Sequence, residues 1–382
     1  MKINKIYSLT LSILLFSACS TKNIEKEPKK QQHHETNTTK TKSYPFLEVS
    51  AREPNFFERE DIPTDVSYDE LQGEFQGNYQ LLEFIDMMVR VHGFEKKYLN
   101  QIFSQAQNYN YIPQTRNCSS NVINGGGAWD RYRSCFIYEK NIRRGVKFWE
   151  EHEEILNQAE ARYGVPVKYI IGILGIETAY GVNFGKHRVI DVLTTKSMLG
   201  GRRASFYTDE LEKYLLISRD IGLEPTEIMG STSGALGYGQ FMPSSYMRFA
   251  VDFNSDGKTD LWDAEDAIGS VANYFAQNGW NPSIPKVAVR ARYKGNRFKK
   301  LKTGYKTKYS LSRLKKKYHI IPREKFHPYG KVSLIKLPRG GYDELWLGSP
   351  NFRVITTYNH STYYGMTAYE LGEAIERRRN GL

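Results

Sequence analysis

The sequence predicts an α+β fold in which helices dominate. Between residues 78 and 164, apolar residues recur at intervals of three and four, which is the spacing of amphipathic helices. Residues 167–177 are apolar on nearly all sides, as expected for a helix buried at the centre of a domain. Residues 287–293 alternate strictly between apolar and polar, which predicts a strand inside a small β-rich module.

Composition and charge limit the class of protein. A chain of 382 residues, 40% hydrophobic and 25% charged, buries a sizeable core, so disorder and fibres are excluded. The mean hydropathy of −0.57, and the lack of a long apolar run beyond a short one at the N-terminus, exclude a polytopic membrane protein. Lys and Arg exceed Asp and Glu by 12, which suggests a polyanionic partner: nucleic acid, a membrane or an acidic cell wall.

The N-terminus has the pattern of an export signal. Lys2 and Lys5 precede an apolar stretch, and small residues precede Cys19, so residues 1–18 are predicted to be a signal peptide. The Ser-Ala-Cys ending resembles the lipobox of bacterial lipoproteins, in which the cysteine is lipidated. An ordinary signal peptide is the alternative; we favour lipidation of Cys19 because no other cysteine lies near.

The residues after Cys19 indicate where the protein is held. Ser20 and Thr21, with no Asp after the cysteine, favour the outer membrane by the usual bacterial sorting pattern. Residues 19–45 contain almost nothing apolar, which is typical of a flexible tether. We therefore expect a lipid-anchored protein on the periplasmic face of the outer membrane, and nucleic acid is excluded as a partner.

Two further cysteines admit two readings. Cys118 and Cys135 would lie in an oxidising compartment, where a disulfide between them is possible. Two buried free thiols are an equal alternative. Neither a Cys-x-x-Cys motif nor a paired Cys/His spacing argues for zinc.

The helical spacing divides the chain into blocks. Residues 46–164 form a predicted N-terminal helical domain, which ends where Gly164 and Pro166 break one helix and start the next. The predicted core consists of residues 165–282 and 351–382, and the β-rich module is inserted in the sequence between these two segments. The other elements predicted in this core are a helix at 209–217, a helix at 264–278, a strand at 352–357 and a closing helix at 367–379.

The β-rich module, residues 283–350, carries the positive charge of the protein. It contains 19 Lys and Arg against three acidic residues, a balance of +16 that exceeds the +12 of the whole chain. The remainder of the chain is therefore slightly acidic, and the basic face belongs to one module.

Glu177 lies on the apolar face of the predicted central helix, in line with Ile170 and Leu174. Burial raises the pKa of a carboxyl group, which allows a glutamic acid to keep its proton near neutral pH and donate it. Gly181 would allow a sharp turn that opens the helix end to a cleft. The alternative is a Glu paired with a buried Arg or capping a neighbouring helix.

A glycine-rich segment follows, with glycines at 234, 237 and 239. This spacing predicts a loop that brings backbone N–H groups, Tyr238 and Gln240 close to a sugar. The segment 234–245 (GALGYGQFMPSS), together with 176–181 (IETAYG) and 358–364 (YNHSTYY), closely resembles the lytic murein transglycosylase B family. The match covers about 78–282 and 350–375.

The resemblance implies a lysozyme-like core and a peptidoglycan lytic transglycosylase without a catalytic cofactor. In that family the Glu matched by Glu177 protonates the β-1,4 bond between N-acetylmuramic acid and N-acetylglucosamine. As a carboxylate it then takes the proton of the muramic acid 6-hydroxyl, which closes on C1 to give a 1,6-anhydro product. One residue acting as acid and then base needs no second carboxylate at the spacing of ordinary glycosidases.

The resemblance also implies a substrate-binding set. The residues that match family positions are Ser231, Gln240, Tyr358, Asn359 and Tyr364 around Glu177, Tyr132 and Tyr274 along the glycan groove, and Arg202 and Arg203 where muramyl carboxylates or peptide stems would lie. Phe206 stands where the family has a Tyr, which keeps ring stacking but loses a hydroxyl; Tyr207 is a possible substitute. The basic module is expected to favour acidic stem peptides and muramyl lactyl groups.

Residues 252–258 fit the first seven positions of an EF-hand loop, which predicts a structural Ca²⁺ site. The expected ligands are Asp252, Asn254, Asp256 and the Lys258 carbonyl, with Asp266 as the closing ligand that the family resemblance favours. A metal-free Asx-turn loop is the alternative.

Two other functions remain open. A hydrolytic muramidase differs only in that water, and not the 6-hydroxyl, attacks the sugar. A wall-binding scaffold would keep the groove without turnover, although Glu177, Gln240 and Tyr358 together argue against it. Protein partners are not identified by the sequence.

Overall fold

The structure is a computed structural model that describes residues 69–109, 126–199 and 201–382. The helices in these ranges are α1 (Tyr79–His92), α2 (Lys96–Ser104), α3 (Ala128–Ser134), α4 (Glu139–Glu151), α5 (Glu153–Tyr163), α6 (Val167–Glu177), α7 (Val189–Met198), α8 (Ala204–Ile221), α9 (Pro243–Phe249), α10 (Ala264–Gln277), α11 (Leu311–Tyr318), α12 (Pro350–Tyr358) and α13 (Thr362–Arg379), with short 3₁₀ turns at Gly73–Phe75, Gly201–Arg203 and Arg297–Lys300. The mainly helical α+β class predicted from the sequence is confirmed.

The strands form two small antiparallel sheets. They are β1 (His187–Arg188), β2 (Met229–Gly230), β3 (Ala288–Arg292), β4 (Ile321–Pro322), β5 (Ser333–Pro338) and β6 (Asp343–Gly348). The first sheet pairs β1 with β2, and the second has the order β4-β3-β6-β5. In the second sheet Leu347 of β6 stands opposite Val289 of β3 and Leu334 of β5, which fixes the register.

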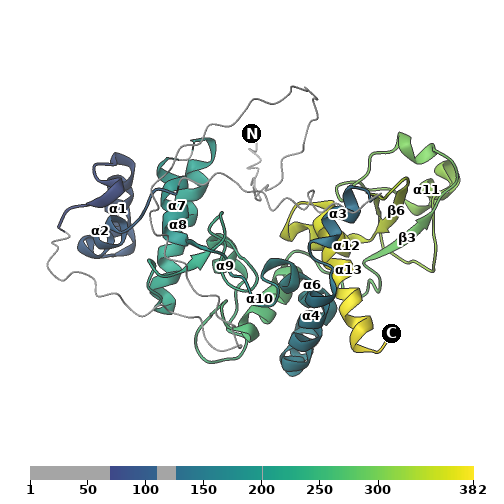
Figure 1. The fold of residues 1–382 in the computed structure, drawn as a ribbon, viewed down its shortest axis with the longest axis horizontal. Coiled ribbons are helices and arrows are strands. Elements are labelled where there is room, and N and C mark those ends of the chain that lie inside the picture. The colour runs from purple at the N-terminus through teal and green to yellow at the C-terminus, as the bar shows by residue number, and fades with distance from the viewer. Residues whose placement is uncertain (1–68, 110–125, 200) are drawn as a thin grey trace, which may run out of the picture. The chain divides into compact units, whose positions relative to one another are not determined.

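Helix α6 is the centre of the core, because its residues from Val167 to Ile176 are buried, with Lys168 as the exception. It packs against α5 and, as Figure 1 shows, lies beside α13, α4 and α10. The contact with α13 is backbone to backbone: a Cβ on Gly172 would stand 2.3 Å from the Ala368 carbonyl oxygen, and one on Gly372 2.1 Å from that of Lys168. Gly172 and Gly372 thus permit the close approach of the two helices, whereas Gly175 makes room for the Tyr180 side chain.

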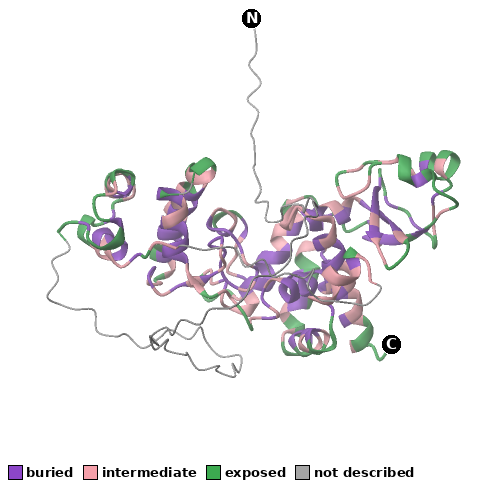
Figure 2. Cartoon of the chain, turned by 45° about the horizontal axis from the view of Figure 1, so that its top comes forward, coloured by how far each residue is buried: buried purple, intermediate pink, exposed green. Residues whose placement is uncertain are grey.

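Helices α3, α4 and α5 belong to the same hydrophobic cluster as α6. Trp129, Phe148 and Leu156 are buried in the cluster that contains Ile170 and Leu371. Figure 2 shows buried segments on the central helices and exposed ones on the outer turns. The segment after residue 126 therefore packs into the core, and the predicted domain boundary at residue 164 stays a prediction. Helices α1 and α2 pack together, and His92 at the end of α1 hydrogen-bonds to Glu212 of α8 at 2.8 Å.

The second sheet has two different faces, as the alternation of its residues predicts. Val289, Ala291 and Leu334 enter a separate small cluster with Phe298 and Leu314. Side chains on the other face join the main core; they are Ile335, Leu337 and Trp346. The β-rich module therefore has its own core and is also fastened to the central one.

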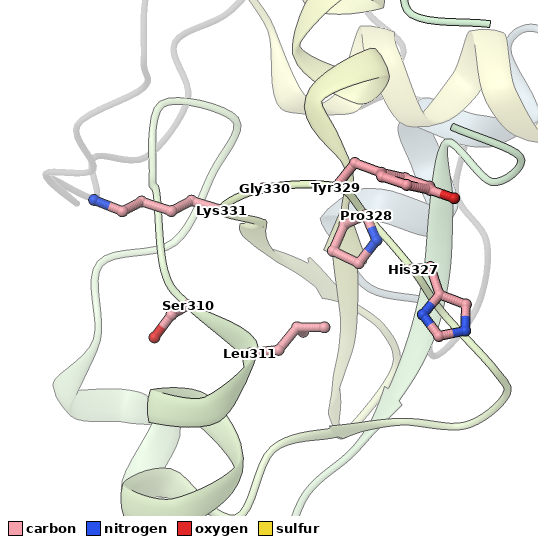
Figure 3. A pocket seen from close by; sticks show the side chains of 7 residues that line it. All are labelled: Ser310, Leu311, His327, Pro328, Tyr329, Gly330 and Lys331. Atoms are coloured by element: carbon pink, nitrogen blue, oxygen red, sulfur yellow. The ribbon is translucent and has the colours of Figure 1, made fainter. Parts of the chain in front are cut away.

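An open hollow of about 540 Å³ lies in this module. It is lined by Ser310, Leu311, His327, Pro328, Tyr329, Gly330 and Lys331. In Figure 3 the side chains of Tyr329 and Lys331 extend in opposite directions, so they do not converge on a common point.

The C-terminal part of the core corrects one expectation. Residues 352–357, predicted as a strand because of their β-branched side chains, lie in helix α12. Pro350 stands in the first turn, where a helix tolerates proline, and Phe352, Ile355 and Thr356 turn a buried face at helical spacing.

The predicted helix at 264–278 is found as α10, within one residue. The one predicted at 209–217 is longer at both ends, as α8. The closing helix begins at Thr362, five residues before the predicted start, because Ser361 caps it by accepting from the Tyr364 N–H. Tyr364 therefore stands on a helix.

Several sequence predictions lie outside the described residues: the signal peptide, Cys19, the tether and Cys118. Cys135 is disulfide-bonded. No helix among the described residues combines the length and apolar character required to cross a membrane.

Candidate active site

Glu177 is the last residue of α6, and the backbone turns sharply directly after it. Ala179, Tyr180 and Gly181 have φ values of 51°, 64° and 81°, all in the left-handed region. Only glycine adopts this region without cost, so two consecutive non-glycine residues there store strain, which is typical of functional sites. The turn expected at Gly181 is confirmed, and a Cβ there would lie 2.5 Å from the Tyr238 ring.

Burial raises the pKa of Glu177 to about 7, against the opposing hydrogen bond from Tyr364. The position at the carboxyl end of α6 adds to this effect, because the helix dipole disfavours a negative charge there. No ion pair among the described residues includes Glu177, so the alternative of a buried Glu–Arg pair is not found. Near neutral pH this carboxyl group is poised between acid and base.

Two tyrosines from the last two helices complete the immediate surroundings of Glu177. Tyr364 of α13 donates its hydroxyl to Glu177 Oε1 at 2.5 Å. Its ring is nearly parallel to that of Tyr358 of α12, with the centroids 6.4 Å apart and an interplanar angle of 9°. Tyr358 in turn donates its hydroxyl to the carbonyl oxygen of Gly239 at 2.6 Å.

The glycine-rich segment forms the loop that the sequence predicts, and it is held against the end of α6. Gly237 has a φ of 65°, and a Cβ on it would lie 2.4 Å from the Leu261 carbonyl oxygen. Gln240 is also left-handed at 50°. The Gln240 amide donates to the carbonyl oxygens of Phe184 and Gly237, both at 3.0 Å.

Thr178 is a site residue that sequence reasoning missed. Its hydroxyl donates to the carbonyl oxygen of Tyr238 at 3.1 Å and accepts from the Gly181 N–H at 3.1 Å. One fully buried side chain therefore joins the helix end, the left-handed turn and the glycine-rich loop. Its place directly after the Glu was the only available signal, because its partner lies 60 residues away.

Tyr132 and Tyr274 extend the site in an aromatic layer. Tyr274 of α10 lies 4.8 Å from Tyr358 between ring centroids and 5.9 Å from Phe241. Tyr132 of α3 lies 5.5 Å from Tyr363, and its pKa is raised by burial and by the negative charge of Glu177. Both tyrosines thus belong to the assembly around Glu177.

Two other predicted site residues, Ser231 and Asn359, are joined less directly to the assembly around Glu177. The Ser231 hydroxyl accepts from the N–H groups of Ser233 and Ala235, so it shapes the turn after β2. Asn359 connects α12 to α13, and its carbonyl accepts from the Ser361 N–H at 2.6 Å. Neither is bonded to Glu177 among the described contacts.

Arg202 and Arg203 lie in the 3₁₀ turn that precedes α8, and Phe206 lies in the first turn of α8. Arg203 is stacked over the rings of Phe206 and Tyr207, at 4.7 Å and 5.4 Å from the centroids. Tyr207 is buried, whereas Phe206 is half-buried. Tyr207 therefore does not occupy the more accessible position, where the family has a Tyr and this chain has Phe206. Described contacts do not join these arginines to Glu177.

The predicted calcium loop closes on its own backbone. Asp252 accepts from the N–H groups of Asp256 and Gly257, and Asp256 accepts from that of Lys258. Ser255 and Gly257 are left-handed, at φ values of 63° and 86°.

Asp266 holds the other side of the loop. It is almost fully buried, and its two oxygens accept from the N–H groups of Phe253 at 2.7 Å and Asp260 at 2.7 Å. Within the described ranges, no three or more His, Cys, Asp or Glu side chains converge as a metal-binding group. The donors are nonetheless the hard oxygens that Ca²⁺ prefers.

Substituting Tyr364 by Phe is expected to raise the pKa of Glu177 by about one unit, because the lost hydrogen bond stabilises the charged form. The measurement is a ¹³C NMR titration with labelled glutamate, with the Glu177→Gln variant identifying the resonance. Tyr358→Phe is the matched control, since that hydroxyl bonds to Gly239. An unchanged or lower pKa in Tyr364→Phe would contradict the assigned hydrogen bond.

Comparisons with known proteins agree with this geometry. Residues 77–373 match the family model described as the transglycosylase SLT domain. Membrane-bound lytic murein transglycosylase B of Escherichia coli (strain K12) is 43% identical over 316 residues, covering 81% of this chain and 86% of that protein.

Solved structures give the same result. The Escherichia coli lytic transglycosylase Slt35 in complex with calcium has a TM-score of 0.75 at 43% identity, covering 81% of this chain and 97% of that one. The soluble lytic transglycosylase SltB1 from Pseudomonas aeruginosa has a TM-score of 0.68 at 35% identity, covering 79% and 99%. The chain therefore belongs to the lytic murein transglycosylase B family, which is built on the transglycosylase SLT domain.

Proposed function

We propose that this member of the family cleaves the β-1,4 bond between N-acetylmuramic acid and N-acetylglucosamine in peptidoglycan, with Glu177 as both acid and base. The observation that carries the proposal is the Glu177 carboxyl at the carboxyl end of a buried helix, with a pKa raised to about 7 and a phenol as its hydrogen-bond partner. That arrangement suits a group that must give a proton and take one back within one turnover.

The reaction uses no water. Protonated Glu177 gives its proton to the glycosidic oxygen, and the bond from C1 to that oxygen breaks. The resulting carboxylate accepts the hydrogen bond of Tyr364 and then takes the proton of the muramic acid 6-hydroxyl, whose oxygen bonds to C1. The products are a 1,6-anhydromuramyl end and a free N-acetylglucosamine hydroxyl, and Glu177 is protonated again. Activity is therefore expected to fall as the pH rises through about 7.

Substrate contacts are proposed for the rings around Glu177, for the glycine-rich loop and for the residues that match family positions. We assign hydrogen bonding of the sugars to Gln240, Ser231 and Asn359, and ring contacts to the tyrosine layer. The substrate-contacting aromatic residues are Tyr132, Tyr238, Tyr274, Tyr358 and Tyr364. Arg202 and Arg203, with Phe206, would meet carboxylates of muramyl groups or stem peptides.

The hydrolytic alternative requires a different arrangement. Ordinary glycosidases place a second carboxylate about 5 to 9.5 Å from the acid. Within the part of the chain that the structure describes, the pKa of Glu177 is set by burial and by the Tyr364 hydrogen bond, and no carboxylate is among the causes of the shift. This favours attack by the 6-hydroxyl over attack by an activated water.

Replacing Glu177 by Gln is expected to lower release of soluble muropeptides from purified sacculi by about 10³-fold, because general acid–base catalysis of this kind contributes about 10²- to 10⁴-fold. Mass spectrometry of the parent's products should give masses one water below the hydrated muropeptides. Glu150→Gln, on the exposed side of α4, is the control. Hydrated products would indicate a muramidase, and equal activity of Glu177→Gln would overturn the assignment.

The basic module is assigned to retention on the polyanionic wall. Substituting Lys299, Lys300, Lys315 and Lys316, all exposed, by Gln lowers its charge balance by four. Binding to sacculi in a sedimentation assay is expected to weaken at low salt, with the difference vanishing near 1 M salt because exposed charges are then screened. Unchanged binding at low salt would remove this role.

Calcium binding is proposed for the loop at 252–266, in line with the calcium complex of Slt35. Asp252, Asn254, Asp256, Lys258 through its carbonyl, and Asp266 would hold the ion, which would stabilise the fold and take no part in the reaction.

Ca²⁺ at 100 times its dissociation constant is expected to stabilise the protein by about 2.7 kcal/mol, raising Tm by several degrees. Isothermal titration calorimetry and thermal unfolding after EDTA treatment measure both effects. Asp256→Ala should abolish the gain, whereas Asp209→Ala, at an exposed position of α8, should keep it. A parent chain that neither binds Ca²⁺ nor gains stability would contradict the site.

The lipid anchor is likewise a proposal. It rests on the Ser-Ala-Cys19 motif and on the membrane-bound relative of Escherichia coli. Attachment through Cys19 to the outer membrane, by the tether at 19–45, would place the enzyme at the periplasmic surface next to its substrate.

A further inference from the structure

We infer that the tip of the β5–β6 hairpin is part of the active-site framework: Arg339 holds Asp130 and thereby fixes α3, which carries Tyr132. The inference rests on the proposed function of Glu177. It gives the inserted basic module a second role, the positioning of an active-site side chain, alongside retention on the wall.

Helix α3 depends on external support. It has seven residues, and a helix of this length is not stable by itself in water. Its first turn is closed by Asp130, which accepts from the Gly127 N–H at 2.9 Å. A contact that fixes Asp130 therefore also fixes the first turn of α3.

Arg339 holds Asp130 from the hairpin. Its Nη1 pairs with Asp130 Oδ1 and its Nε with Glu344 at 3.2 Å. Asp130 and Arg339 are each about 19% exposed at the side chain, so this pair is better shielded than an ordinary surface ion pair. Burial pushes the pKa of Asp130 upward, but the bonds from Arg339 and Gly127 prevail and hold it below its usual range.

The backbones also meet at this point. A Cβ on Gly127 would stand 2.2 Å from the carbonyl oxygen of Pro338, the last residue of β5. The start of α3 is therefore in direct contact with the end of the strand, and side-chain rearrangement cannot create space between them. At the other end of α3, Arg133 pairs with Glu370 of α13 at 2.5 Å.

Tyr132, the active-site side chain of α3, lies between these two fixed ends. Trp129 is fully buried and stacks with Tyr132, with ring centroids 6.4 Å apart. Both rings contact Tyr363, at 5.4 Å and 5.5 Å. The titratable groups that interact with Glu177 are Tyr132 of α3, Tyr358 of α12 and Tyr364 of α13.

Loss of the ion pair between Arg339 and Asp130 should therefore change the surroundings of Glu177. A displaced α3 would move Tyr132 and admit water next to the carboxyl group, and the part of the pKa elevation that comes from burial would decrease. Misplacement of about 1 Å in such a constellation reduces turnover by up to about 100-fold. Arg339 is thus a positioning residue that acts through Asp130.

The test compares Arg339→Gln, Asp130→Asn and the double variant in the full chain. We expect kcat on soluble glycan strands to fall about 10-fold in each single variant, with the double variant no worse. The Glu177 pKa, followed by ¹³C NMR, should fall from about 7 by about half a unit or more. Arg339→Lys, which keeps the charge, should recover part of both quantities.

Arg378→Gln is the matched control, because Arg378 pairs with Glu139 at 2.8 Å between α13 and α4, and neither residue belongs to α3 or to the hairpin. It should leave kcat and the Glu177 pKa as in the parent. Folded Arg339→Gln protein with parental kcat and parental pKa, or losses that add in the double variant, would overturn the inference. The NMR readout does not require turnover, so a parent that released only hydrated products would refute the proposed function and leave this test valid.

Discussion

The main physical constraint on the structure is the free-energy cost of a charged carboxylate at Glu177, where the side chain has little contact with water. Glu177 is half-buried at the end of a helix that is buried along almost its whole length, so its carboxyl group meets mostly protein and the negative end of the helix dipole. Both effects favour the protonated form, and the hydrogen bond from Tyr364 limits the shift to a pKa of about 7. Acid and base behaviour near neutral pH follow from this balance.

The surrounding fold preserves that balance. Close packing of α6 against α13, permitted by Gly172 and Gly372, brings Tyr364 to Glu177. The left-handed residues Ala179 and Tyr180 end the helix abruptly, and the Thr178 hydroxyl fastens this strained turn to the glycine-rich loop. The strain is kept because several independent contacts hold each side of the turn.

Features of the fold with a local signal in the sequence could mostly be predicted. The central helix, its glutamate, the turn at Gly181 and the glycine-rich loop have local signals in spacing and residue type, and each is found as predicted. The segment at 352–357 was predicted wrongly because β-branched residues favour strands locally, whereas Pro350 and packing on α13 impose a helix.

Contacts between distant residues could not be predicted in the same way. Thr178 with Tyr238 and Asp130 with Arg339 join segments 60 and 209 residues apart, and no periodicity records such pairs. The places of Tyr132 and Tyr364 came from resemblance to a family, and their contacts with neighbouring rings came from the fold. The alternation of residues 287–293 and the excess of Lys and Arg predict a basic β-rich module, but neither pattern carries a signal for its attachment to α3.

The most direct test of the central claim is digestion of purified sacculi by the parent protein in H₂¹⁸O, with mass spectrometry of the released muropeptides. If Glu177 acts alone and the 6-hydroxyl is the nucleophile, the cleaved ends are anhydro sugars that carry no ¹⁸O. Incorporation of one ¹⁸O at each new reducing end would show that water attacks, and would contradict the account of a single carboxyl acting as acid and then base.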